Sequence, residues 1–245
     1  VEPYCNDFGG AIIGSTINKY AYCSIVPRED DQIIVHSLDF DMTVKYNTRE
    51  NYVYDGRLDL VTAALKAMDI KQGCEVYLQC DAPRGSGLGT SSILAGACVK
   101  ALYEITGRKL EEDELYNRVL CMEQIMSTGG GWQDQVGGLA PGIKMVTSHA
   151  EVRQQISCMP CVVSEKTMKE LDERFCLIYS GQRRLARNLL RDVVGRYVGG
   201  NPDAVEVLYE IQRSAVLMRF ELEKGDVDAF ARLLNEHWEL SKRLD

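Results

Sequence analysis

The chain of 245 residues contains no apolar run near the 18 or so residues that a membrane-spanning helix needs. It also lacks a recognisable signal peptide, an internal repeat and any low-complexity tract. These absences favour a globular cytoplasmic protein without a membrane partner. The chain begins with Val1 rather than Met, so we expect its natural N-terminus to lie upstream.

Positive charge is scarce as well. There are 28 Lys and Arg against 36 Asp and Glu, which gives a net charge of −8. A nucleic-acid-binding surface usually needs a basic excess, so we expect no nucleic-acid partner. The hydrophobic share of 45% is ordinary for a globular protein, and this length suffices for one large domain or two small ones.

Signals for a metal or redox centre are weak. The three histidines, at positions 36, 149 and 237, have neither metal-site nor catalytic-triad spacing. Most of the nine cysteines lie in apolar runs, which is typical of buried free thiols in a cytosolic protein. Cys158 and Cys161 have the spacing of a redox pair, but they do not open a helix and no second pair accompanies them.

Hydrophobic patterning predicts the secondary structure. Four short β-rich runs predict an antiparallel meander over 11–18, 20–26, 32–37 and 42–47. Helices are predicted over 58–68, 91–106 and 111–126, and strands over 74–80, 140–146 and 174–180. Residues 182–244 are predicted to be helical, with breaks at "GGNPD" and "KGD". A change of composition near residue 150 predicts two domains, 1–150 and 151–245.

A glycine-rich stretch, "RGSGLGTSS" at 84–92, lies between a predicted strand and a predicted helix. Glycines allow tight turns and close approach to a ligand, and a helix N-terminus suits an anion. A P-loop would need Lys before its hydroxyl pair, but Gly89 is followed by Thr90. The dinucleotide fingerprint fails too, because its last glycine falls on Thr90 or Ser92. A phosphate loop of another kind and a purely structural turn both remain open.

A second glycine-rich stretch, "STGGGWQDQVGG" at 127–138, is flanked by carboxylates. Glu123 precedes it and Asp134 follows eleven residues later. Such a pair suits phosphoryl transfer, in which one acid holds Mg²⁺ and the other orients or deprotonates the attacking hydroxyl. Ser91 or Thr90 could add an oxygen ligand to the metal. The alternatives are that Glu123 is a solvated helix residue and that Asp134 is an N-cap.

Taken together, these residues resemble a known family. The run from Pro83 to Ser92 resembles the P-x-x-x-G-L-G-S-S loop of the GHMP kinases, which include galactokinase, homoserine kinase, mevalonate kinase and phosphomevalonate kinase. The resemblance implies an α+β, two-lobed fold with a β/α ATP-binding N-terminal lobe and a mostly helical C-terminal lobe. It also implies that ATP and sugar bind in the cleft between the lobes.

The resemblance implies roles for individual residues. Ser91 and Glu123 fall on the family's Mg²⁺ ligands, and Asp134 falls on its catalytic aspartate. The loop that would wrap the phosphates of ATP comprises Pro83, Gly85, Ser86, Gly87, Leu88, Gly89, Thr90 and Ser91.

Longer segments resemble particular branches of the family. "GLGTSSILAG", "GGGWQDQVGGLAPGIK" and "YSGQRRLARNLLRDV" are similar to the L-fucokinase branch, including the kinase half of the bifunctional fucokinase/GDP-fucose pyrophosphorylases. "GGAIIGSTINKY" is also similar to bacterial heptose-phosphate kinases. The implied reaction is transfer from ATP to the anomeric hydroxyl of L-fucose or a similar sugar. The alternatives are a D-glycero-D-manno-heptose 7-phosphate kinase and a non-catalytic sugar- or nucleotide-binding module, against which the metal ligands and the aspartate argue.

Four residues are predicted on the sugar side of the site: Tyr4, Gly131, Trp132 and Arg183. Trp132 is predicted either to stack on a sugar face or to belong to the core. Arg183 and its neighbours Arg184 and Arg187 either reach the cleft or form a solvated helix face. The upstream part of the first family motif and the third, glycine-rich motif are absent, so both ends are expected to be trimmed. The sequence makes no prediction of oligomeric state.

Overall fold

The computed structural model describes residues 2–49, 58–83, 85–125, 131–151, 155–181 and 186–244. Contacts within the chain divide it into two compact units. Residues 18–128 form the central unit, and residues 1–17 together with 129–245 form the terminal unit. This division by compactness differs from the composition change near residue 150, and the family domains 1–150 and 151–245 stay a prediction.

The central unit contains a mixed four-stranded sheet among its described residues. Its strands, in the spatial order β2-β5-β3-β4, are β2 (Ala21–Pro27), β5 (Cys74–Cys80), β3 (Gln32–Ser37) and β4 (Met42–Asn47). All four were predicted as strands. Side chains alternate along β5, where Val76 is 2% exposed and Tyr77 is 37% exposed. This period of two gives the sheet one buried face.

The predicted meander is wrong beyond its last hairpin. β3 and β4 do pair antiparallel, but β5 inserts between β2 and β3 and runs parallel to β3. The first run of the predicted meander forms β1 (Gly10–Ser15), which belongs to the sheet of the terminal unit. Alternation along a strand specifies which face is buried, but it carries no information about which strand lies beside it.

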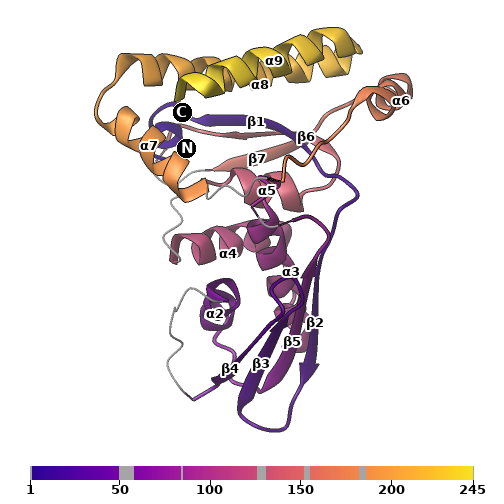
Figure 1. The fold of residues 1–245 in the computed structure, drawn as a ribbon, viewed down its shortest axis with the longest axis vertical. Coiled ribbons are helices and arrows are strands. Elements are labelled where there is room, and N and C mark those ends of the chain that lie inside the picture. Colours follow the sequence, from indigo (N-terminus) through magenta and orange to yellow (C-terminus); the bar gives the residue numbers. More distant parts are fainter. Residues whose placement is uncertain are drawn as a thin grey trace. The chain divides into compact units, whose positions relative to one another are not determined.

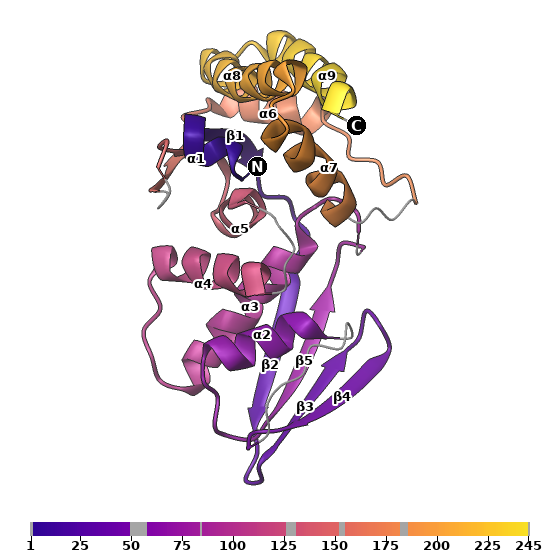
Figure 2. The same cartoon turned by 90° about the vertical axis from the view of Figure 1, so that its left-hand side faces the viewer.

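Three helices cover the buried face of this sheet: α2 (Asp59–Ala67), α3 (Thr90–Ile105) and α4 (Glu112–Ile125). They begin and end within one residue of the predicted limits. α3 packs on β2 and β5, and α2 and α4 pack against α3 (Figure 2). The core between these layers includes Val35, Leu78, Val99 and Leu102, each at most 1% exposed. This packing holds the loop between β5 and α3 at one end of the sheet.

The terminal unit contains an antiparallel sheet in the order β1-β6-β7, with β6 at Ile143–Ser148 and β7 at Ile156–Pro160. β1 and β6 pair although they lie far apart in the sequence, and Ile12 lies opposite Val146. α5 (Gln133–Leu139) packs on β1 and β6, and so does α8 (Pro202–Lys224). The two helices lie on opposite faces of the sheet (Figure 1).

The remaining helices of the terminal unit are α1 (Tyr4–Phe8), α6 (Glu165–Arg174), α7 (Ala186–Val198) and α9 (Val227–Leu244). The predicted breaks are confirmed. Asn201 caps α8 by accepting the N–H of Ala204, and Pro202 occupies its first position. Gly225 ends α8 in the left-handed conformation.

The strand predicted over 174–180 is wrong. Arg174 is the last residue of α6, and residues 175–180 form no strand. The side chain of Ile178 is 81% exposed. A strand forms only where a neighbouring strand accepts its backbone hydrogen bonds, and no described strand pairs with this run. The apolar pattern alone could not reveal that.

The predicted burial of the cysteines is confirmed for some of them. All nine cysteines are free thiols. Cys5, Cys74 and Cys98 are buried as predicted, whereas Cys158 and Cys176 are exposed. Desolvation raises the pKa of Cys74 to about 11, so its thiol is neutral near pH 7.

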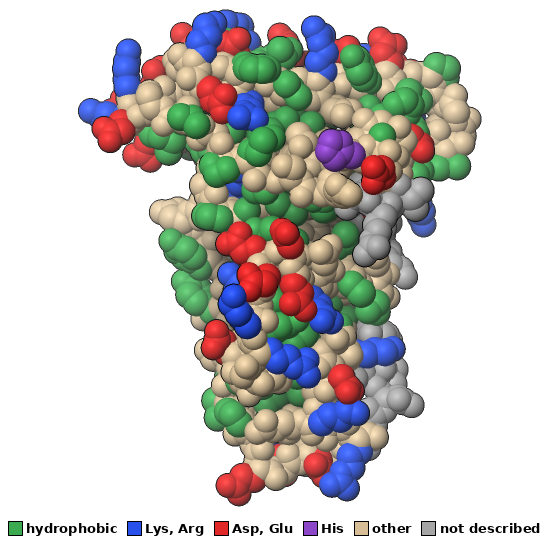
Figure 3. Space-filling model, turned by 180° about the vertical axis from the view of Figure 1, so that it is seen from behind, with side chains coloured by type: hydrophobic (Ala, Val, Ile, Leu, Met, Phe, Trp, Pro, Cys, Tyr) green, Lys and Arg blue, Asp and Glu red, His purple; other side chains and the backbone are tan. Residues whose placement is uncertain are grey.

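Acidic and basic side chains are interspersed over the face in Figure 3. No helix within the described ranges is both long and apolar enough to cross a bilayer.

Candidate active site

The loop between β5 and α3 depends on its glycines. Gly85, Gly87 and Gly89 all have positive φ, at 68°, 81° and 64°. L-residues with a side chain rarely adopt this region, whereas glycine enters it at little cost. The N–H of Ser86 donates to the carbonyl of Pro83 at 3.2 Å, which closes the first turn. Arg84 lies outside the described residues.

The N-terminus of α3 offers unsatisfied donors. Gly89 is its N-cap and supplies no side-chain cap, and the first turn has no acidic residue. The N–H of Ile93 donates to the carbonyl of Gly89 at 3.1 Å, so the three preceding N–H groups have no acceptor within the helix. Ser86 Oγ is buried and has no hydrogen-bond partner among the described residues. An anion with several oxygens fits these donors and the positive end of the helix dipole.

The other residues of the predicted phosphate loop differ in their exposure to solvent. Pro83 and Gly87 are exposed, and Leu88 and Thr90 are half-buried. A Cβ added at Gly87 would meet nothing within 4 Å, so φ rather than crowding requires glycine there. The structure thus assembles the described members of the predicted phosphate loop in one continuous turn beside α3.

Glu123 is a buried residue rather than a solvated one, because its side chain on α4 is only 8% exposed. Its Oε1 accepts a hydrogen bond from the hydroxyl of Ser92, which is 1% exposed. Ser91, which was predicted to be a Mg²⁺ ligand together with Glu123, is exposed on the first turn of α3. Sequence reasoning missed Ser92, which lies one residue beyond the motif P-x-x-x-G-L-G-S-S. The position of Ser92 in the predicted helix was the available signal. Consecutive helical residues point about 100° apart, so Ser91 and Ser92 had to face different directions.

Asp134 lies in the first turn of α5 and is not an N-cap, because Trp132 occupies that position. The residue is exposed, yet desolvation by the surrounding protein raises the pKa of its carboxyl above the usual value. The residue is accessible to solvent, and the surrounding protein still removes part of the hydration of its carboxyl. A raised pKa suits a carboxylate that receives a proton. Gly131 is half-buried and precedes Trp132, the N-cap of this helix.

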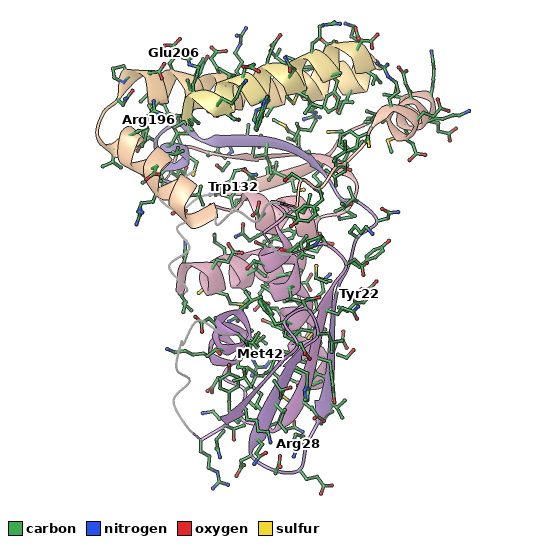
Figure 4. All side chains as sticks on the ribbon, viewed as in Figure 1. Tyr22, Arg28, Met42, Trp132, Arg196 and Glu206 are labelled. Carbon is green, nitrogen blue, oxygen red and sulfur yellow. The ribbon has the colours of Figure 1, made fainter. Side chains whose placement is uncertain are left out.

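Trp132 is buried, at 5% exposure, where α5 begins (Figure 4). A Cβ added at Gly10 would lie 2.7 Å from Cζ2 of its ring. The indole therefore packs against the backbone of β1 at a position that only glycine leaves open. This burial favours the core alternative, and stacking on a sugar stays a prediction.

We expect Gly10→Ala to displace the indole and to lower the free energy of unfolding by about 1–3 kcal/mol, as overpacking of a core does. Gly14→Ala on the same strand is the matched control, because a Cβ there meets nothing within 4 Å. Urea denaturation monitored by tryptophan fluorescence measures both variants. Equal stability of the two would contradict the packing assigned to Trp132.

Tyr4 also belongs to the core of the terminal unit. Its ring is 5% exposed, and its hydroxyl donates to Oε1 of Gln212 at 3.0 Å. Burial raises the pKa of its phenol, so it stays neutral near pH 7. Arg183 and Arg184 lie outside the described residues, as does the side chain of Arg187. Their predicted roles, and that of Tyr4 toward a sugar, stay predictions.

Lys144 is a further residue that the sequence did not single out. Its side chain is 1% exposed, and Nζ donates to the carbonyls of Ala140 at 2.5 Å and Gly142 at 3.2 Å. Ala140 ends α5, the helix that carries Asp134. Lys144 therefore binds the carbonyl end of that helix, where a cation is favourable. Desolvation lowers its pKa from the usual value.

Residues 51–140, which include the glycine loop, Glu123 and Asp134, match the family "GHMP kinases N terminal domain". The chain contains a GHMP kinase N-terminal domain. Its fold is that of the GHMP kinases. The crystal structure of a D-glycero-D-manno-heptose 1-phosphate kinase from Bacteriodes thetaiotaomicron matches 99% of this chain and 74% of its own, with TM-score 0.82 and 26% identity. Mevalonate kinase from Methanococcus jannaschii, at 14% identity, shares the fold with TM-score 0.67 over 98% of this chain and 74% of its own.

Curated relatives of the chain fall into two groups. The bifunctional fucokinase/GDP-fucose pyrophosphorylase of Arabidopsis thaliana is 37% identical over 76% of this chain and 18% of its own length. The L-fucokinase/L-fucose-1-P guanylyltransferase of Bacteroides fragilis is 34% identical over 72% and 19%. The D-glycero-alpha-D-manno-heptose 7-phosphate kinase of Campylobacter jejuni is 26% identical over 99% and 72%. The chain thus spans about a fifth of the two bifunctional relatives.

Proposed function

We propose that this protein transfers the γ-phosphoryl group of ATP to a sugar hydroxyl. One observation carries the proposal: three positive-φ glycines precede an uncapped helix N-terminus, beside the buried hydroxyl of Ser86. That combination suits a polyphosphate, because several backbone donors and the positive end of the helix dipole are available to one anion. The family match over the same residues supports it.

The loop's part in the reaction is positioning and charge stabilisation. Free N–H groups at the start of α3 would hold the phosphate oxygens and bring the γ-phosphoryl group in line with the acceptor. Ser91 and Glu123 would supply hard oxygen ligands, which fit Mg²⁺, and that ion would neutralise charge on the phosphates when bound.

Asp134 would orient the sugar hydroxyl and accept its proton as the phosphoryl group is transferred. Its exposed position leaves it accessible, and its raised pKa increases its strength as a base. The balanced reaction converts ATP and a sugar into ADP and a sugar phosphate, with one proton released through Asp134.

For the substrate we propose L-fucose, phosphorylated at its anomeric hydroxyl. The two fucokinase relatives share 37% and 34% identity with this chain, against 26% for the heptose 7-phosphate kinase. The second candidate is a heptose 7-phosphate, because that relative matches 99% of the chain. Its phosphate would need cations, a role open to Arg183, Arg184 and Arg187.

A coupled ADP-release assay on the intact protein decides between them. We expect turnover with L-fucose and weaker turnover with D-arabinose, since a pocket for the C6 methyl discriminates by only about 10²-fold. Turnover with a heptose 7-phosphate alone would overturn the fucose proposal and leave the sugar kinase in place. ATP binding without turnover on any sugar would instead favour the non-catalytic binding module.

A further inference from the structure

Ser92 and Glu123 form a buried hydroxyl–carboxylate pair between two helices of the central unit. Ser92 is the third residue of α3, and Glu123 is the third from the end of α4. Their exposures are 1% and 8%, and the hydroxyl of Ser92 donates to Oε1 of Glu123. α3 and α4 pack directly against each other, so both ends of the bond are anchored in packed helices.

The hydrogen bond has two physical consequences for the carboxylate. It offsets part of the cost of holding an ionised group away from water. It also restricts the terminal torsion of Glu123, which is otherwise broad. A carboxylate has about four lone-pair sites, so a hydrogen bond to Oε1 does not by itself prevent the group from binding a cation. Ser92 therefore orients the carboxylate.

The two adjacent serines divide their work because of helix geometry. Consecutive helical residues point about 100° apart. Ser91 is exposed on the first turn of α3, whereas Ser92 is buried against α4. The Ser91 hydroxyl is accessible to a ligand, and the Ser92 hydroxyl is directed to Glu123. In the run "TSS", the Ser91 hydroxyl is thus exposed to solvent, and the Ser92 hydroxyl is bonded to Glu123 within the protein.

We propose that Ser92 is a positioning residue that sets the Glu123 carboxylate for Mg²⁺. This inference rests on the proposed function, in which Glu123 is a metal ligand for the ATP complex. The phosphates of ATP and the Glu123 carboxylate would both carry negative charge near the N-terminus of α3. The orientation of the carboxylate would therefore determine how well a single Mg²⁺ ion can bind to both groups. Loss of the Ser92 hydroxyl weakens Mg²⁺ binding without removing any ligand to the metal.

The test is calorimetric titration of Mg²⁺ into the intact protein with the non-hydrolysable β,γ-imido analogue of ATP. We expect Ser92→Ala to raise the Mg²⁺ concentration for half-saturation about tenfold, the size of a lost hydrogen bond to a charged group. Ser92→Thr keeps the hydroxyl and is expected to restore most of the affinity. Ser214→Ala is the matched control, because Ser214 is also a buried helical serine, 6% exposed, that donates to the carbonyl of Ile211.

A double-mutant cycle separates positioning from general stability. If Ser92 acts through Glu123, Ser92→Ala has no further effect on Mg²⁺ affinity in a Glu123→Gln background. Unchanged Mg²⁺ affinity in Ser92→Ala, or an equal loss in both backgrounds, overturns the proposal. Ser92→Cys, with a much weaker donor of similar size, replaces Ser92→Ala should the latter not fold. If the wild-type protein shows no Mg²⁺-dependent nucleotide binding, the proposed function fails first and this inference with it.

Discussion

Asp134→Asn is expected to lower turnover by about 10²–10⁴-fold while ATP affinity stays unchanged, because general acid–base groups contribute rates of this size. Asn preserves the shape of the side chain but cannot accept the proton of the sugar hydroxyl. The measurement is ADP release at saturating sugar, alongside calorimetric ATP binding. Near-normal turnover on the true substrate would show that Asp134 is not the base.

The same substitution is expected to raise thermal stability near neutral pH. Desolvation raises the pKa of Asp134, so the folded state binds this proton more readily than the unfolded state. Ionisation of Asp134 therefore opposes folding, and stability falls as pH rises through its raised pKa. Asparagine carries no charge and removes this penalty. If Asp134 is the catalytic base, its charge is held at some expense of stability, as active-site groups often are.

Melting temperatures at about pH 4 and about pH 7 check the sign of this effect. The gain of Asp134→Asn over wild type should be larger at the higher pH. Asp113→Asn is the matched control: Asp113 is an exposed first-turn residue of α4. That variant should leave turnover unchanged and should lack the gain in melting temperature. A gain at neutral pH in both variants would point to net charge rather than to the surroundings of Asp134.

Gly89→Val is expected to weaken ATP binding at least tenfold. Gly89 has φ 64° and caps α3 in the left-handed conformation. A side chain in that conformation costs about 1–2 kcal/mol, and its Cβ would also obstruct the close approach of phosphate to the backbone. Calorimetric ATP affinity measures the loss, and circular dichroism confirms that the fold is intact.

Gly107→Val is the matched control for the backbone strain. Gly107 also has φ 64°, but it follows the other end of α3, and a Cβ there meets nothing within 4 Å. Both variants should lose similar stability, and only Gly89→Val should lose ATP affinity. ATP binding within about twofold of wild type in folded Gly89→Val would rule out the phosphate-loop assignment.

Local patterns predicted much of the fold and part of the site. The strands 32–37, 42–47 and 74–80 and the helices of the central unit followed from periodicity, because alternation and 3.6-residue repeats depend only on neighbouring residues. β7 and α6 were missed. Ser164 caps α6 by accepting the N–H of Thr167, and this signal was present in "SEKT".

The sequence by itself revealed the glycine-rich loop, the carboxylates of Glu123 and Asp134, and the resemblance to the GHMP kinases. Gly85, Gly87 and Gly89 were recognisable because a positive φ demands glycine whatever surrounds it. Residue type and spacing sufficed there, since the constraint on φ is local to the backbone.

Only the tertiary structure decided which strands pair and which side chains are buried. β1 pairs with β6 rather than with β2, and Ser92 rather than Ser91 meets Glu123. The burial of Trp132 against Gly10 was equally undetermined by sequence. These outcomes depend on contacts between residues far apart in the chain. Such contacts form where buried apolar area and satisfied hydrogen bonds are greatest, and no local pattern encodes that sum.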